Sequence, residues 1–234
     1  MRLIDLFKEM DKKKLTLKMQ IRQEYYRVKE LLDGKRPSRM ELFTYMDDDI
    51  YRICVSGSHA KENPFQHYLD FLYELGELSE DEQELYAGIG REFIQTIETT
   101  EMQKVYKMPI LYSFYNHGDI RLAVTDEEVL ESWKEFFDTG TNWKDFPNVN
   151  TYEDYKIVTD KQHLSKAKRM PIRFLKASGK GFFVEKDGYA LALRDEIGDV
   201  VGNMAFGEQM GDVLGYRSLE YYRRRYKKNK SEGD

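Results

Sequence analysis

The sequence predicts a predominantly α-helical α+β protein, in which a helical bundle carries a small C-terminal β-hairpin. Three observations predict this fold class. Apolar residues recur at spacings of three and four over several long segments, which is typical of amphipathic helices. Ser or Thr stands three residues before Glu at the start of several such segments, a pattern that caps helices. The alternating segment "GFFVEKDGYALAL" turns at Asp187 and Gly188, which predicts the hairpin.

Composition is that of a folded protein. The 234 residues are 41% hydrophobic and 14% aromatic, enough for one large domain or two small ones with a sizeable core. No segment approaches the roughly 18 consecutive apolar residues of a membrane-spanning helix, so we expect no membrane partner. The charged segment "MRLIDLFKEMDKKK" lacks the apolar run of a signal peptide, and Cys54 is the single cysteine. We expect a cytoplasmic protein without internal disulfides.

The first two expected regions are helical. Region 1–34 is an N-terminal arm, with a short helix in "LIDLFKEM" and an amphipathic helix that ends at Gly34. Region 35–100 is acidic. Its first helix begins at the capping box of Ser38 and Glu41, and a later one begins at Ser79 and Glu82.

Region 101–177 holds the segment "KMPILYSFYNHGDI". Pro109 fits the first turn of a helix, which Gly118 then ends. The residues "DIRLAV" alternate as in a short strand, and Thr125 with Glu128 caps the next helix. This order of helix, strand and capped helix favours a winged-helix-like unit, although other helical cores share it.

Region 178–234 contains the hairpin, which could serve as a wing, and a basic C-terminal helix. Leu219, Tyr222 and Tyr226 share one stripe of that helix, which we expect to face the core. Arginines and lysines would then project outward. Tyr221 could stack on an exposed base, although tyrosines in such a stripe more often pack in the core.

Charge is segregated along the chain, whose net charge is −5. Residues Glu41 to Glu101 hold 15 acids and three bases, whereas Lys161 to Gly181 hold seven bases and no acid. Basic blocks of this kind attract a polyanion, complement an acidic surface, or form a solvated face. We expect them to contact DNA phosphates. The candidate nucleic-acid-binding residues are Lys104, Lys107, Lys166, Lys168, Arg169, Arg173, Lys176, Arg217, Arg223, Arg224, Arg225, Lys227 and Lys228.

Enzymatic signatures are weak. The four histidines are dispersed, no phosphate-binding loop of the G-x-x-x-x-G-K-[ST] type occurs, and "DDDIY" is not a DEAD box. We therefore expect no cofactor, no metal and no catalytic residue. A weak match to a metal-dependent nuclease site, two acids followed by a lysine, occurs at Asp145, Asp154 and Lys156.

Three patches, "GKRPSRMELFTYMDDDIY", "ETTEMQKVYKMPILYSFYNHGDI" and "DVLGYRSLEYYRRRYKK", resemble the C-terminal, non-motor accessory region of bacterial DEAD/DEAH-type superfamily 2 helicase-like proteins, including restriction-linked ones. The resemblance implies a region that helps to choose or hold DNA, with a helicase or nuclease subunit or domain as partner. The leading hypothesis is a non-catalytic DNA-binding accessory module. The alternatives are a protein–protein scaffold that uses the acidic half, and the nuclease.

Overall fold

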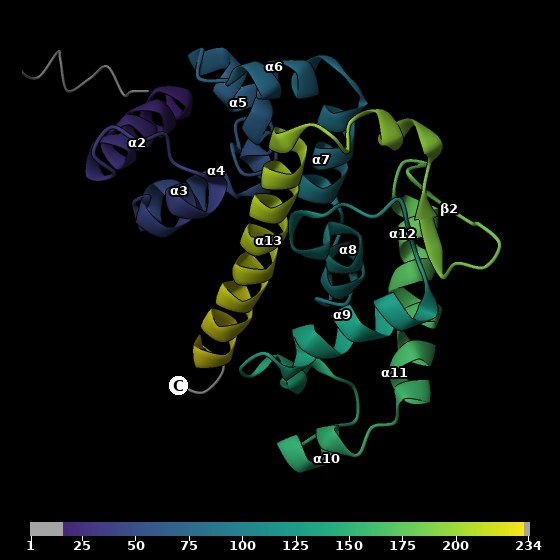
Figure 1. Ribbon diagram of the computed structural model, residues 1–234. Coiled ribbons are helices and arrows are strands. Elements are labelled where there is room, and N and C mark those ends of the chain that lie inside the picture. Colours follow the sequence, from purple (N-terminus) through teal and green to yellow (C-terminus); the bar gives the residue numbers. More distant parts are fainter. Residues whose placement is uncertain (1–15, 232–234) are drawn as a thin grey trace, which may run out of the picture. The chain divides into compact units, whose positions relative to one another are not determined.

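The computed structural model describes residues 16–231, with side chains as far as Tyr226. These residues are mostly helical and include a three-stranded antiparallel sheet, which confirms the predicted fold class (Figure 1). The chain divides into two compact units, Met1–Glu77 and Leu78–Asp234, so the division falls inside the acidic region 35–100. The short helix expected in "LIDLFKEM" lies outside the described residues. None of the described helices is long and apolar enough to cross a membrane.

The first unit consists of short helices and one 3-10 turn. They are α2 (Leu17–Leu31), α3 (Arg39–Tyr45), α4 (Asp48–Cys54), η1 (Gly57–His59) and α5 (Tyr68–Leu75). Ile21, Tyr25 and Val28 form the buried stripe of α2, as their spacing predicts.

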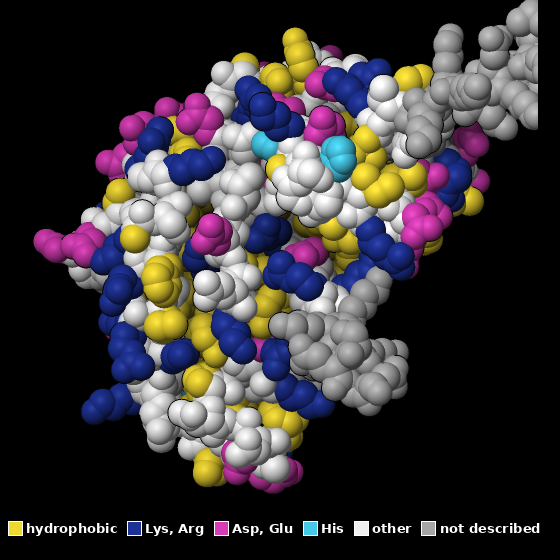
Figure 2. All heavy atoms as spheres, turned by 180° about the vertical axis from the view of Figure 1, so that it is seen from behind, with side chains coloured by type: hydrophobic (Ala, Val, Ile, Leu, Met, Phe, Trp, Pro, Cys, Tyr) yellow, Lys and Arg dark blue, Asp and Glu magenta, His cyan; other side chains and the backbone are white. Residues whose placement is uncertain are grey.

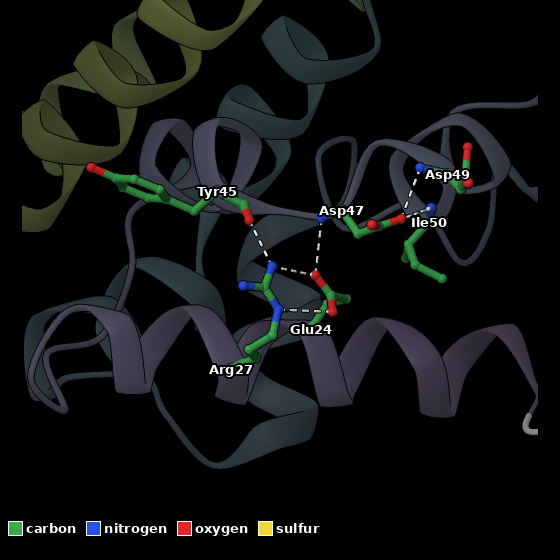
Figure 3. Close-up of polar contacts among 6 residues, drawn as sticks. All are labelled: Glu24, Arg27, Tyr45, Asp47, Asp49 and Ile50. Atoms are coloured by element: carbon green, nitrogen blue, oxygen red, sulfur yellow. Dashed lines mark hydrogen bonds and ion pairs between the residues drawn. The ribbon is translucent and has the colours of Figure 1, made fainter.

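The triple acid at residues 47–49 begins a helix. Asp47 is the N-cap of α4, and its Oδ1 accepts hydrogen bonds from the backbone N–H groups of Asp49 and Ile50, at 2.9 and 3.2 Å (Figure 3). The backbone N–H of Asp47 donates in turn to Glu24 of α2, whose carboxylate also accepts two bonds from Arg27. These contacts give Asp47 a structural role at the start of α4.

The second unit begins with helices α6 and α7, contains the small sheet and ends in the long helix α13. Its elements are α6 (Glu80–Ala87), α7 (Ile89–Thr99), α8 (Lys107–Tyr115), η2 (Asn116–Gly118), β1 (Ala123–Val124), α9 (Asp126–Asp138), η3 (Asn142–Asp145), α10 (Tyr152–Lys156), α11 (Asp160–Ala167), the π-helical turn η4 (Lys168–Ile172), α12 (Arg173–Ser178), β2 (Phe183–Val184), β3 (Leu191–Leu193), η5 (Asp195–Asp199) and α13 (Met204–Ser231).

The sheet joins the expected hairpin to the strand that precedes α9. Its order is β1–β3–β2, both pairs are antiparallel, and Ala192 faces both Ala123 and Val184. Gly188 adopts a positive φ of 83° in the turn between β2 and β3, which accounts for glycine at that position. The first strand thus pairs with the last, and the chain passes through α8, α9 and the continuous helical segment 160–178 on the way to the hairpin.

Capping boxes begin helices where the sequence predicts them. The pairs Ser38 with Glu41, Ser79 with Glu82, and Thr125 with Glu128 all make both reciprocal hydrogen bonds. Pro109 lies in the first turn of α8, where its missing N–H costs no hydrogen bond. Most of α8 is buried, so this segment is a core helix.

Helix α13 presents a different face to the core from the one expected. Leu219 and Tyr226 are 41% and 45% exposed, so the predicted stripe is wrong. The buried face instead passes through Met210, Leu214 and Tyr221, and α13 packs against α6, α7 and α8 (Figure 1). Helix α13 thus has two stripes of apolar residues, and its packing against α6, α7 and α8 determines which one is buried.

Candidate nucleic-acid interface

The helical segment 160–178 turns one side toward the core and presents basic residues on the other. His163, Ala167 and Leu175 are buried. The opposite side carries a stripe of exposed residues at spacings of three and four, which we call the basic stripe: Lys161, Ser165, Arg169, Arg173 and Lys176. Figure 2 views the molecule from behind, and Lys and Arg side chains follow one another down the edge where α12 and α11 lie.

Lys168 and Lys176 carry acidic partners at the surface. The Lys168 ammonium lies 2.6 Å from the carboxylate of Asp126, and Lys176 pairs with Glu185. Exposed pairs of this kind contribute little to stability, because solvent screens them, so a phosphate can compete for the lysine. Among the described residues, Lys161, Arg169 and Arg173 have no acidic partner.

Lys166 belongs to this segment but not to the basic stripe, and Lys104 lies close to it. The Lys166 ammonium is 5.0 Å from the ring centroid of Tyr106, which is buried. The pKa of Lys166 is lowered by its partial burial, and also by the nearby charges of Arg169 and Lys104. Lys104 therefore shares an electrostatic environment with Lys166 and Arg169, although about 60 residues separate it from them in the sequence.

Lys107 is not available to a ligand, so this prediction is wrong. The side chain is buried, and its Nζ donates to the Thr100 hydroxyl at 2.8 Å and to the Glu101 carbonyl at 2.9 Å. Burial lowers its pKa. Lys107 stabilises the segment that joins α7 to α8.

Arg217 and Tyr221 also belong to the core, so the prediction that Arg217 binds nucleic acid is wrong. Arg217 donates to the carbonyl oxygens of Glu98 and Thr100, at 2.6 and 2.5 Å, so it satisfies carbonyls at the C-terminal end of α7. Tyr221 is 5% exposed and its hydroxyl donates to Asp145 Oδ1 at 3.0 Å. A buried tyrosine cannot stack on a base.

The remaining predicted cations of α13 differ in availability. Arg225 pairs with Asp145, a buried carboxylate, and therefore has a structural role. Arg224 is exposed and lies 3.8 Å from Glu220. Arg223 is half-buried and has a partner of its own. The side chains of Lys227 and Lys228 lie outside the described residues.

The three residues of the possible nuclease site each have a separate structural contact. Asp145 accepts from Tyr221, Asp154 closes the capping box of α10, and the Lys156 ammonium lies 4.7 Å from the Tyr152 ring centroid. In the part of the chain that the structure describes, no group of three or more His, Cys, Asp or Glu side chains could hold a metal ion.

The hairpin has a mixed tip. Glu185 and Asp187 flank Lys186 between β2 and β3, and all three are exposed. Phosphates would be repelled by the two carboxylates. The wing is thus a less suitable phosphate contact than the basic stripe.

Comparison with known proteins adds no independent evidence. No family model, no curated protein and no solved structure matches this chain.

Proposed function

We propose that this chain is a non-catalytic DNA-binding accessory module, and that the basic stripe on α11 and α12 contacts DNA phosphates. The observation that carries the proposal is the stripe itself. Its exposed cations share one side of a helix whose opposite side is anchored in the core. Phosphate contacts supply affinity and position the protein without reading sequence.

The wider context is a helicase or restriction-type system. The three patches that resemble the accessory regions of superfamily 2 helicase-like proteins support this assignment. A helicase or nuclease subunit or domain would then supply the motor or the cutting activity, and this chain would hold the DNA.

The test is DNA binding by fluorescence anisotropy at about 50 and 200 mM salt. Four phosphate contacts predict a loss of affinity of about a hundred-fold over this range. In an Arg169→Ala, Arg173→Ala variant two contacts would remain, and the loss would fall to about ten-fold. Neither arginine has a partner among the acids of the described residues, so the variant should fold normally.

A matched control removes two cations elsewhere. Arg52→Ala combined with Lys61→Ala makes the same change in net charge in the first unit, where both residues are exposed. This control should bind DNA with the wild-type salt dependence. If wild-type protein fails to bind DNA at low salt, the proposal is wrong, and the acidic half becomes the surface to test with protein partners.

A further inference from the structure

A groove of about 740 Å³ lies beside the first half of the basic stripe, between the residues after η3 and helix α11. Its cationic walls are Lys161, Lys166 and Arg169. Lys161 and Arg169 also belong to the basic stripe. A ligand bound along the stripe can therefore continue into the groove without leaving positively charged surface.

The groove holds more positive than negative charge. Its lining includes one carboxylate, Asp154, whose Oδ2 accepts hydrogen bonds from the backbone N–H groups of Asn150 and Thr151 at 3.2 and 3.0 Å. Those bonds stabilise the negative charge in place. Among the described residues, Lys166 and Arg169 have no acidic partner, and Lys166 is partly desolvated. An anion bound here would relieve the repulsion between these cations.

The other walls are suited to nucleobases. Asn148, Asn150 and Ser165 supply amide and hydroxyl groups that can donate to or accept from base edges. Ile157, which is 78% exposed, and Val149 supply apolar surface. Within a duplex, the bases are stacked and their pairing edges are occupied, whereas an unpaired strand can splay its bases into a recess of this size.

We propose that this groove binds the unpaired strand of a DNA that has a single-stranded overhang, while the basic stripe holds the adjoining duplex. The inference rests on the proposed DNA-binding function. It adds a preference that the stripe alone does not supply, because phosphate contacts on a duplex are the same whether or not the end is blunt.

The experiment compares a labelled blunt duplex with the same duplex carrying a six-nucleotide 5′ or 3′ overhang, bound to the full chain and followed by fluorescence anisotropy. The wild-type protein should bind at least one overhang DNA about ten-fold more tightly than the blunt duplex, a difference that one or two hydrogen bonds to base edges can supply.

Two variants separate the groove from the stripe. In the groove variant, Asn150→Ala with Lys166→Met, overhang and blunt DNA should bind equally, with blunt-duplex affinity within about three-fold of wild type, since neither residue belongs to the basic stripe that holds the duplex. Methionine keeps the apolar stem of Lys166 against Tyr106. In the stripe variant, Arg173→Ala with Lys176→Ala, both DNAs should bind more weakly by the same factor, so the ten-fold preference persists. Thermal melting checks that each variant is folded.

The binding results distinguish failure of the groove proposal from failure of the DNA-binding proposal. If the wild type binds blunt and overhang DNA equally, and the stripe variant weakens both, the groove proposal is wrong and the DNA-binding proposal stands. The groove proposal is also wrong if the groove variant keeps the preference for overhang DNA. If the wild type binds none of the three DNAs, both proposals are wrong.

Discussion

Arg225 of α13 forms an ion pair with Asp145, whose side chain is only 1% exposed. The same carboxylate accepts a hydrogen bond from Tyr221, and the backbone carbonyl of Asp145 accepts one from Tyr106 at 2.7 Å. One residue of the η3 turn therefore connects the C-terminal helix to the segment that begins α8. This arrangement assigns Arg225 to the fold and not to a ligand.

We expect Arg225→Ala to lower the free energy of unfolding by about 3 kcal/mol, because it leaves a buried carboxylate without its cationic partner. Urea denaturation measures the change. Arg224→Ala is the matched control, since Arg224 is exposed and its pair with Glu220 should contribute less than about 1 kcal/mol. A loss in Arg225→Ala that is as small as the loss in Arg224→Ala would show that the Arg225 pair is not structurally important.

Lys104 and Lys107 are three residues apart and should respond oppositely to substitution. Lys107→Ala removes one buried and one partly buried hydrogen bond and should cost about 2 kcal/mol of stability. Lys104→Ala should leave stability within about 0.5 kcal/mol of wild type, and it should weaken DNA binding. Urea denaturation and anisotropy on the same two variants make the comparison, and a destabilised Lys104→Ala protein would contradict it.

We expect the free energy of unfolding to fall in mild acid because of His163. The side chain is buried against Phe146, with ring centroids 4.9 Å apart, and burial lowers its pKa in the folded protein below the usual 6.5. The unfolded chain then binds a proton first as pH falls. The contribution of neutral His163 to the free energy of unfolding is fully present above pH 6.5 and is lost as the pH falls through the pKa of the folded protein. Its total size is about 1.4 kcal/mol for each unit by which the folded pKa lies below the unfolded one.

The measurement is urea denaturation between pH 5 and 7.5, with His163→Phe for comparison. Phenylalanine keeps the ring contact and cannot be protonated, so its stability curve should be flatter over this range. Lys134, Asp160 and Asp138 contribute to the electrostatic environment of His163 and are the same in both proteins. Parallel curves for the two proteins would show that His163 does not cause the pH dependence.

Cys54 should be chemically inert in the native protein. It is fully buried in α4, and burial raises the pKa of its thiol to about 12. Because the thiolate is the nucleophile, a disulfide reagent at pH 8 should react only after denaturant unfolds the first unit. Stoichiometric reaction within seconds in the absence of denaturant would contradict this assignment.

Local rules predicted much of the fold. The boxes at Ser38, Ser79 and Thr125 begin helices because their partners lie three residues away, within reach of any helical chain. The turn at Asp187 and Gly188 likewise depends on its own backbone and produces the expected hairpin. The sequence also indicated the basic segment 161–181. Arg169, Arg173 and Lys176 were candidates and lie on the basic stripe, whereas Lys161 was not among the candidates.

Other features depended on contacts between distant segments. In the sequence, Arg217 resembled a DNA-binding arginine. In the structure, α13 packs against α7, and Arg217 donates to the carbonyl of Glu98, which is 119 residues away in the sequence. The same packing selected which stripe of α13 is buried. The groove beside α11 arises only when the residues after η3 fold against that helix. The sequence by itself thus determined where helices begin and where positive charge accumulates, because both depend on neighbouring residues. Only the tertiary structure decided which of those charges are free to bind a ligand, because burial depends on segments that meet through folding.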